Sequence, residues 1–306
     1  MPENPRENRE RPVRVALLGQ PNVGKSSLFS RLTGVGVISS NYPGTTVSFD
    51  EGAITRNGRT VTVRDLPGTY SISGNSDDER VVLKNLMEEE FDCVVLVADA
   101  ASLSGSLVLC IEAMELGIPT ILALNKIDAA RRDFDIDAEK LGSLLGTKVV
   151  FVSSKTSEGV DALADAICAG EAVLSPLKIS YDAGIEAGIA CVSDALPEHL
   201  PFSRRGIALK ILEGTTEFDS YADANLVSSA DSIEKLYEKT EGRTMAVSIA
   251  TARYTFAESV CRESVRRIER KQTFSERLSD ILITPRYGLP ILAAVCLAIL
   301  AIVIYG

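Results

Sequence analysis

The chain has 306 residues, a hydrophobic fraction of 45% and a formal net charge of −10. This length exceeds the usual size of one domain, so we expect two folded units with room for a tail. The acidic balance disfavours a nucleic-acid partner, because such surfaces normally need clustered Lys and Arg. Six cysteines without a C-x-x-C pair and a single histidine disfavour disulfide frameworks, metal clusters and Ser-His-Asp catalysis.

Residues 1–11 are polar, with alternating charges, and predict a disordered lead-in rather than a secretory signal. After them, short runs rich in β-branched residues alternate with segments long enough for helices. The expected strands are 13–19, 60–65, 93–99, 120–125 and 148–153, and the expected helices are 24–33, 77–89, 103–115, 137–145 and 160–169. This alternation predicts an α/β domain over 12–171, with a mostly parallel sheet and helices on both faces. Ligands of such sheets bind beyond the carboxyl ends of the strands.

A glycine-rich segment follows the first expected strand. Its residues Gly19, Gln20, Pro21, Asn22, Val23, Gly24, Lys25 and Ser26 fit the pattern G-x-x-x-x-G-K-[ST] of a P-loop. Glycines let backbone N–H groups approach a phosphate chain, and the following helix presents its positive end to that chain. We expect Lys25 to bridge the β- and γ-phosphates, Ser26 to ligate Mg²⁺ and Ser27 to lie in the same nucleotide-binding segment. The pattern alone fits ATPases as well as GTPases.

A second group of residues is suited to recognising guanine. It consists of Asn125, Lys126, Asp128, Ser153, Ser154 and Lys155, which follow two of the expected strands. The Asp128 carboxylate can accept hydrogen bonds from guanine N1–H and N2–H₂, which adenine lacks, and such a pair rejects the wrong base by roughly 10⁴-fold. We expect Lys126 to lie along the base plane and the Ser154 N–H to donate to guanine O6. With the P-loop, this group predicts a protein that binds and hydrolyses GTP.

Two further segments are expected at the γ-phosphate. Residues 65–68 fit D-x-x-G, so Asp65 would hold Mg²⁺ through water and the Gly68 N–H would bind the γ-phosphate, which makes the next loop nucleotide-sensitive. Gly44 lies in a Pro-Gly turn before Thr45 and Thr46. One of these threonines should close over Mg²⁺ and the γ-phosphate, and spacing alone does not choose between them.

The segment after Gly68 lacks a water-orienting glutamine, because Thr69 stands where Ras-type GTPases keep one. Intrinsic hydrolysis without such help is on the order of 10⁻³ s⁻¹ or slower. Our hypothesis is that Asn22 holds a K⁺ ion beside the phosphates and that backbone groups of the nucleotide-sensitive loops position the water.

The pattern changes after about residue 170. Strand-like runs vanish, and 207–212, 231–237 and 244–271 carry helical spacing, which predicts a small helical domain over 172–272. A juxtamembrane linker over 273–286 leads to a first transmembrane segment over 287–306, where 289–305 is apolar except for Pro290. At about 1.5 Å per residue this run is marginal against a hydrocarbon core of about 30 Å, and a buried core helix is the alternative. Basic residues before the span place that side in the cytoplasm.

Taken in order, these motifs resemble the FeoB (ferrous iron transport protein B) family of GTPases. Residues 41–47 are similar to its switch I, 65–71 and 76–80 to its switch II, and 208–214, 252–254 and 288–290 to later segments. The resemblance selects Thr46 as the Mg²⁺ ligand and implies K⁺ dependence through Asn22. Lys25, Thr46 and Gly68 are then the expected catalytic set.

The resemblance also implies partners and a location. We expect a cytoplasmic GTPase domain at the cell (inner) membrane, a helical domain that slows GDP release, and a membrane-embedded Fe²⁺ transport half outside these 306 residues. The resemblance also suggests two further partners, a small FeoA-like protein and a second copy of the chain.

Two segments depart from the family pattern. Residues 125–128 read Asn-Lys-Ile-Asp instead of Asn-Met-x-Asp, and 99–107 lacks the usual Glu-Arg-Asn, which affects expected contacts after the strand 93–99. An Era- or MnmE-like GTPase acting on ribosomal or transfer RNA is the alternative function, and the acidic balance and apolar terminus disfavour it. A nucleotide-binding scaffold without turnover is the third.

Overall fold

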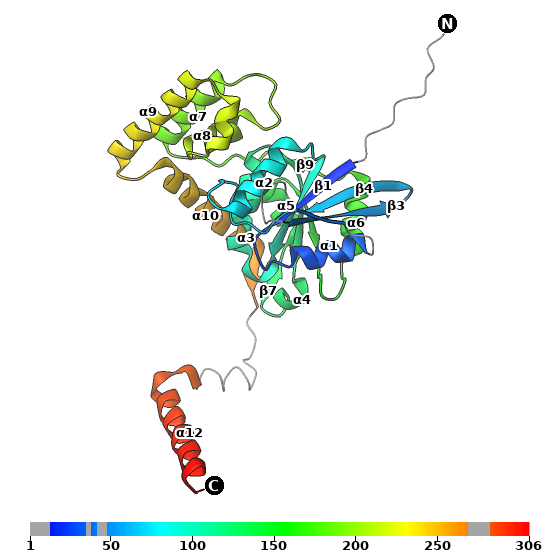
Figure 1. Cartoon of the computed structure of the whole chain (residues 1–306), viewed down its shortest axis with the longest axis vertical. Helices are drawn as coiled ribbons and strands as arrows, with labels where there is room; N and C mark the ends of the chain where they lie inside the picture. Colours follow the sequence, from blue (N-terminus) through cyan, green and yellow to red (C-terminus); the bar gives the residue numbers. More distant parts are fainter. Residues whose placement is uncertain (1–12, 35–37, 42–47, 269–281, 306) are drawn as a thin grey trace. The chain divides into compact units, whose positions relative to one another are not determined.

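A computed structural model of the protein describes residues 13–34, 38–41, 48–268 and 282–305 (Figure 1). The chain divides into two compact units, Met1–Arg266 and Arg267–Gly306. Gly44, Thr45 and Thr46 lie outside the described residues, as do the predicted lead-in and most of the predicted juxtamembrane linker. The expected division at residues 171 and 172 stays a prediction.

The α/β part of the first unit contains a twisted sheet with helices on both sides (Figure 1). In chain order its strands and helices are β1 Val13–Gly19, α1 Lys25–Thr33, β2 Ile38–Asn41, β3 Ser48–Arg56, β4 Arg59–Asp65, α2 Asp77–Glu88, β5 Cys93–Asp99, α3 Leu103–Glu115, β6 Pro119–Asn125, α4 Ile127–Ala130, β7 Phe134–Ile136, α5 Ala138–Leu145, β8 Lys148–Phe151, α6 Val160–Ala169 and β9 Val173–Leu174.

The sheet has the strand order β2-β3-β4-β1-β5-β6-β8, with β9 paired to β6. Strand β1 pairs in parallel with β4 and β5, and β6 pairs in parallel with β5 and β8. The pairs β2–β3, β3–β4 and β6–β9 are antiparallel. The predicted mostly parallel α/β sheet is therefore confirmed, and its carboxyl edge carries the ends of β1, β4, β5 and β6.

The core lies on both faces of this sheet because successive side chains of a strand point to opposite sides. Leu17 and Val95 pack with α1 and α6, whereas Leu18 and Leu96 pack with α2, α3 and α5. Since both faces are covered, these strands are almost continuously apolar, which is why the sequence predicts them well.

The helical part contains α7 Ala183–Ala195, α8 Arg204–Leu212, α9 Ala224–Glu241 and α10 Met245–Ser264. A side chain caps the first turn of each helix: Asp182, Ser203, Asp223 and Thr244 each accept a hydrogen bond from the backbone N–H three residues on. The last helix, α10, packs against α3 and α5 of the α/β part as well as against α9.

The expected helix over 244–271 is wrong at its end. Helix α10 stops at Ser264, and residues Val265–Arg267 form strand β10, which pairs with β7. The Ser264 carbonyl accepts a 2.8 Å hydrogen bond from the backbone N–H of Asp137, the residue that follows β7. This carbonyl therefore bonds the α/β part instead of a further turn of helix. The expectation that strands vanish after residue 170 is wrong for the same reason, and short β9 also contradicts it.

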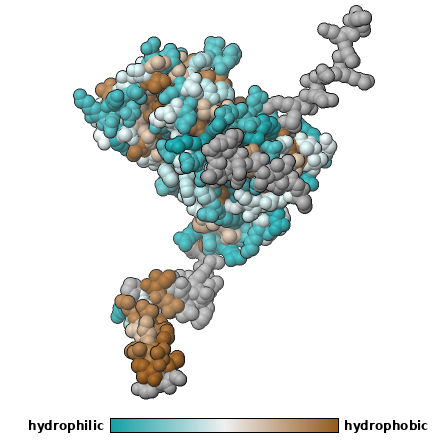
Figure 2. All heavy atoms as spheres, in the orientation of Figure 1, coloured by the Kyte–Doolittle hydropathy of each residue, from teal (hydrophilic) through white to brown (hydrophobic). Residues whose placement is uncertain are grey.

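The second unit contains helix α12, Pro285–Tyr305. Its segment Arg286–Ile304 has a mean hydropathy of 2.7, and none of it is buried. Figure 2 shows its apolar surface in brown. Among the described residues this is the one helix long and apolar enough to cross a membrane.

Candidate functional site

The glycine-rich loop connects β1 to α1 at the carboxyl edge of the sheet, and its backbone conformation depends on glycine. Gly24 has φ +87°, and a Cβ there would lie 2.5 Å from Nδ2 of Asn125. A Cβ on Gly19 would lie 2.6 Å from the carbonyl oxygen of Val97. The loop can therefore lie close to its neighbours only because these side chains are absent.

A cavity of about 430 Å³ opens above this loop. It is lined by Gln20, Pro21, Asn22, Gly24, Lys25, Ser26, Ser27, Gly68 and Asp78. All of these except Asp78 belong to the set predicted from the sequence to bind nucleotide, and that role stays a prediction. Asp78 lies in the first turn of α2, within residues 76–80 that resemble the family's switch II, but it was not among the predicted nucleotide-binding residues.

Lys25 connects the loop to the end of β4. Its ammonium group bonds the Asp65 carboxylate and the carbonyl oxygen of Leu66. Lys25 and Asp65 are each only 6% exposed, so the charges neutralise each other in a buried setting. Because both partners belong to the D-x-x-G segment, a phosphate that binds Lys25 must compete with that segment for the same ammonium group.

The D-x-x-G segment also contacts the loop directly. The backbone N–H of Thr69 donates a 3.2 Å hydrogen bond to the Gly19 carbonyl. A Cβ on Gly68 would lie 3.1 Å from Cα of Pro21, so the two backbones are close together. The structure thus brings Gly68 and Asp65 to the P-loop, as the sequence predicts.

Asn125 joins the loop to the predicted base-recognition residues. Its side-chain amide donates to the Val23 carbonyl at 2.8 Å, and its Oδ1 accepts from the Ser154 backbone N–H at 2.9 Å. The Asp128 carboxylate accepts a 2.7 Å hydrogen bond from the Ser153 hydroxyl, which orients it. Lys155 is exposed at the rim. The predicted base-recognition residues therefore surround one end of the P-loop.

Lys126 makes a contact that the sequence analysis missed. Its ammonium group donates to the Asn22 carbonyl at 2.7 Å and pairs with Oδ2 of Asp99 at 2.6 Å. Asp99 also caps the short turn after β5 by accepting from the Ala101 N–H at 2.9 Å. A carboxylate at the end of a buried parallel strand is the signal that would have found it. Residues 99–107 lack the family's usual Glu-Arg-Asn, and the Asp99–Lys126 pair is a contact that this segment makes instead.

The donor chemistry of the site fits a hard divalent cation. Ser26 supplies a hydroxyl oxygen to the cavity and Asp65 a carboxylate beside it, both ligand types that Mg²⁺ takes together with phosphate oxygens. No group of three or more His, Cys, Asp or Glu suited to a metal occurs among the described residues, and all six cysteines are free. A Mg²⁺ ion would therefore depend on the nucleotide for part of its coordination.

The strand-loop-helix cradle, its buried lysine and the oriented Asp128 carboxylate at one sheet edge define the class of GTP-binding P-loop domains. Residues 13–167 match the family described as Ferrous iron transport protein B, and residues 181–266 match the FeoB cytosolic helical domain. The chain belongs to the FeoB family.

Curated relatives agree with this assignment. The Fe(2+) transporter FeoB of Salmonella typhimurium is 33% identical over 284 residues, which cover 90% of this chain and 36% of that protein. A fusion of Fe(2+) transport protein A with Fe(2+) transporter FeoB from Porphyromonas gingivalis is 30% identical over 297 residues, covering 91% of this chain and 35% of that protein. The chain thus spans roughly a third of the length of these relatives.

Solved structures give the same result for the fold. The cytosolic domain of L. pneumophila FeoB superposes with a TM-score of 0.74 at 29% identity, covering 83% of this chain and all (100%) of that one. The cytosolic domain of the T. maritima FeoB iron transporter in its GMPPNP form gives a TM-score of 0.70 at 33% identity, covering 83% of this chain and 99% of that one.

Proposed function

We propose that this chain binds GTP and hydrolyses it to GDP and phosphate as the cytoplasmic part of a ferrous iron transporter, with its nucleotide state coupled to Fe²⁺ uptake. The observation that carries the proposal is the Asn125 side chain, which hydrogen-bonds the P-loop at Val23 and the base-recognition loop at Ser154. A phosphate-binding loop and a guanine-binding carboxylate are thereby held on one rigid frame.

Different residues of the site bind different parts of the nucleotide. Backbone N–H groups of residues 19–26 and the N-terminus of α1 bind the phosphates, and Lys25 neutralises the β- and γ-phosphate charge. Asp128, oriented by Ser153, accepts from the guanine edge, while Lys126, held by Asp99, lies along the base. Gln20, Pro21, Val23, Ser27, Gly44, Thr45, Ser153 and Lys155 complete the proposed nucleotide contacts.

Hydrolysis would rely on positioning and charge rather than on a side-chain base. Ser26, Thr46 and Asp65 would hold Mg²⁺, which supplies charge neutralisation to the phosphates when bound. Asn22 lines the cavity with an exposed side chain, a place from which it can hold K⁺ beside the phosphates. Gly68 would donate its N–H to the γ-phosphate, and backbone groups of the two switch segments would orient the attacking water.

The membrane role rests on the relatives and on α12. The relatives are named as Fe(2+) transporters, and α12 has the length and composition of a membrane span. We therefore place the chain at the cell (inner) membrane, joined to a membrane-embedded transport half. The Porphyromonas gingivalis fusion supports a FeoA-like protein as a partner, and self-association is part of the proposal.

Phosphate release by the purified 306-residue chain tests the proposal. We expect slow GTP turnover in Mg²⁺ that rises when Na⁺ is replaced by K⁺, and no comparable turnover of ATP. Equal rates in the two salts would remove the K⁺ site at Asn22. Bound GTP that is recovered intact after long incubation with Mg²⁺ and K⁺ would contradict hydrolysis and support a binding scaffold.

A further inference from the structure

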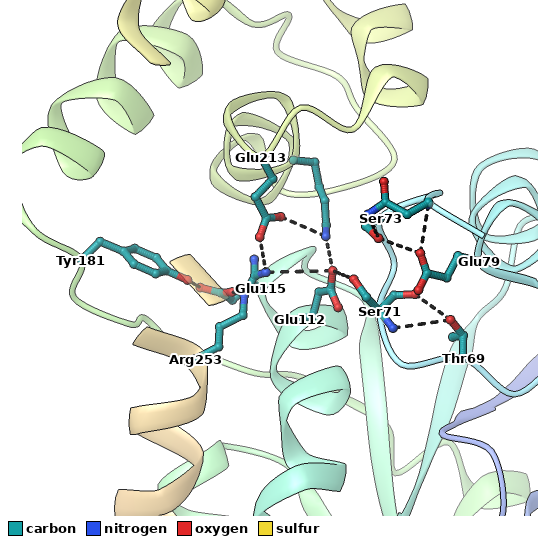
Figure 3. A network of polar contacts seen from close by, with 11 residues as sticks. Thr69, Ser71, Ser73, Glu79, Glu112, Glu115, Tyr181, Glu213 and Arg253 are labelled. Carbon is teal, nitrogen blue, oxygen red and sulfur yellow. Dashed lines mark hydrogen bonds and ion pairs between the residues drawn. The ribbon is translucent and has the colours of Figure 1, made fainter. Parts of the chain in front are cut away.

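A buried group of charged side chains lies where α3 meets the helical part, outside the proposed nucleotide site (Figure 3). We call it the polar cluster, and its members are Glu112 and Glu115 of α3, Lys210 of α8, Glu213 after it, Arg253 of α10 and Tyr181 before α7. Lys210, Glu112 and Arg253 are 1%, 2% and 4% exposed. Buried charges are costly unless paired, so their partners decide what the cluster does.

The pairs connect three helices. The Lys210 ammonium group bonds Glu112 and lies 3.1 Å from Oε2 of Glu213. Arg253 donates to Oε2 of Glu115 at 2.7 Å and also bonds Glu213. The Tyr181 hydroxyl donates to Oε1 of Glu115 at 2.7 Å. Residues of the α/β part and of the helical part therefore share one network.

The pKa values of two members of the cluster, Glu213 and Arg253, are shifted toward their charged forms. Burial by itself acts to raise the pKa of Glu213, but the positive charges of Arg253 and Lys210 outweigh it and lower that pKa. Burial likewise acts to lower the pKa of Arg253, and Glu213, Glu115 and Glu112 outweigh it, so the pKa of Arg253 is well above its usual value. Three carboxylates face two cations, which gives the cluster a formal excess of negative charge.

Glu112 extends this network to the segment that follows D-x-x-G. The Ser71 hydroxyl donates a 3.1 Å hydrogen bond to Oε1 of Glu112, the same oxygen that Lys210 bonds (Figure 3). Thr69 lies two residues earlier, donates its hydroxyl to the Ser71 carbonyl at 2.8 Å and its N–H to Gly19 of the P-loop. A continuous series of contacts therefore runs from the P-loop to α8.

We propose that Glu112 is a positioning residue for residues 65–71, acting through the Ser71 hydroxyl and held in place by Lys210. This inference rests on the proposed function, because it assigns a role in nucleotide discrimination. The carboxylate stabilises the conformation in which Asp65 and Leu66 bond Lys25. Lys210 belongs to α8, so the helical part and the nucleotide-sensitive segment both bond Oε1 of Glu112. A change in the conformation of either one therefore changes the conformational equilibrium of the other.

The direction of the effect follows from the bonds that must break. Binding of the β-phosphate to Lys25 is common to GDP and GTP, but only GTP carries a γ-phosphate that would bind the Gly68 N–H and so require residues 65–71 to move further. The Ser71–Glu112 hydrogen bond opposes that movement. Its removal should raise the affinity for a GTP analogue relative to GDP by roughly two- to tenfold, the factor that matches the usual net contribution of one hydrogen bond.

The test compares Ser71→Ala with Ser73→Ala in the full chain. Ser73 lies in the same loop and donates to Oε2 of Glu79 at 2.7 Å, so its variant removes a serine hydroxyl without touching the polar cluster. Dissociation constants for fluorescent GDP and a fluorescent non-hydrolysable GTP analogue give the affinity ratio. We expect the ratio to shift in Ser71→Ala, to stay at the wild-type value in Ser73→Ala and to be restored in Ser71→Thr, which keeps the hydroxyl.

A double-mutant cycle assigns the effect to Glu112. We expect Glu112→Ala, which removes the acceptor oxygen, to shift the ratio in the same direction and Ser71→Ala to add nothing in that background. Additive effects of the two changes, or a wild-type ratio in Ser71→Ala, would overturn the proposal. The Ser71 comparison stands by itself if Glu112→Ala does not fold. A wild-type chain that binds no guanine nucleotide would instead overturn the proposed function.

Discussion

The side-chain amide of Asn125 donates a 2.8 Å hydrogen bond to the backbone carbonyl of Val23. This bond joins the end of β6 to the P-loop after β1, two strands that do not pair with each other in the sheet. Asn125 is completely buried, and its other bonds go to Ser154. The relative position of the phosphate and base sites therefore depends on this side chain, together with Lys126, which also bonds the P-loop at the Asn22 carbonyl.

Replacing Asn125 with Ala tests this dependence. The change leaves the Val23 carbonyl and the Ser154 N–H without their partner, which should lower the free energy of unfolding by about 1–3 kcal/mol. The affinity for GDP should fall more than stability alone explains, because both loops lose their common anchor. Urea unfolding and fluorescence titration measure the two effects. Asn225→Ala, at an exposed site on α9, is the matched control and should change neither.

Asp99 should contribute to affinity through Lys126. In Asp99→Asn the 2.6 Å ion pair is lost and the lysine is held only by the Asn22 carbonyl. Because the Lys126 side chain is 37% exposed, solvent screens the pair, and we expect GDP to dissociate no more than about fivefold faster. Stopped-flow release of fluorescent GDP measures this. An unchanged rate would mean that Lys126 keeps its position without Asp99.

Lys25→Ala should abolish nucleotide binding by removing the charge that faces the phosphates. The same change leaves the Asp65 carboxylate buried without its cation, so a loss of stability is also expected. Circular dichroism must therefore show a folded protein before the binding result is interpreted. Near-normal GDP affinity in the folded variant would contradict the proposed role of the loop.

The polar cluster predicts an acid-sensitive contribution to stability. The pKa of Glu213 in the folded protein lies below its usual value of 4.5, so its contribution is present above about that pH and is lost as the pH falls through the lower folded pKa. Urea unfolding between pH 7 and pH 3 should show this loss in the wild type. Glu213→Gln should be less stable at pH 7 and should lack that part of the acid dependence.

Glu238→Gln is the control for this pH series, because Glu238 is exposed on α9. Its stability should follow the wild-type curve at every pH. An acid dependence in Glu213→Gln that equals the wild-type one would show that other carboxylates account for the loss.

Much of the fold could be predicted because its buried parallel strands are continuous apolar runs. The sequence does not predict strand β3, since it pairs antiparallel near the sheet edge and is neither a continuous apolar run nor a regular alternation, with Asp50 next to Glu51 and Ala53 next to Ile54. Strand β10 could not be predicted, because its pairing with β7 is a tertiary contact made where α10 packs on the α/β part. Tertiary contacts override local helical spacing there.

The residues of the site likewise fall into those that the sequence predicts and those that it does not. The P-loop and the D-x-x-G segment depend on local backbone chemistry, so residues such as Gly24 and Lys25 could be located from their spacing. The Asp99–Lys126 pair and the Ser71–Glu112 contact join residues from separate elements, and no spacing along the chain predicts them. No pattern along the chain predicts that the charged residues of α3, α8 and α10 meet in one buried cluster.

The proposed function requires that the P-loop binds the phosphates of a nucleotide while Asp128 recognises its guanine base. Isothermal titration calorimetry of the full chain with GDP and ADP, in Mg²⁺ and K⁺, tests it most directly. We expect binding heat with GDP and roughly 10⁴-fold weaker affinity for ADP, because adenine lacks the N–H donors from which Asp128 would accept hydrogen bonds. No heat with GDP, or equal affinity for the two nucleotides, would contradict it.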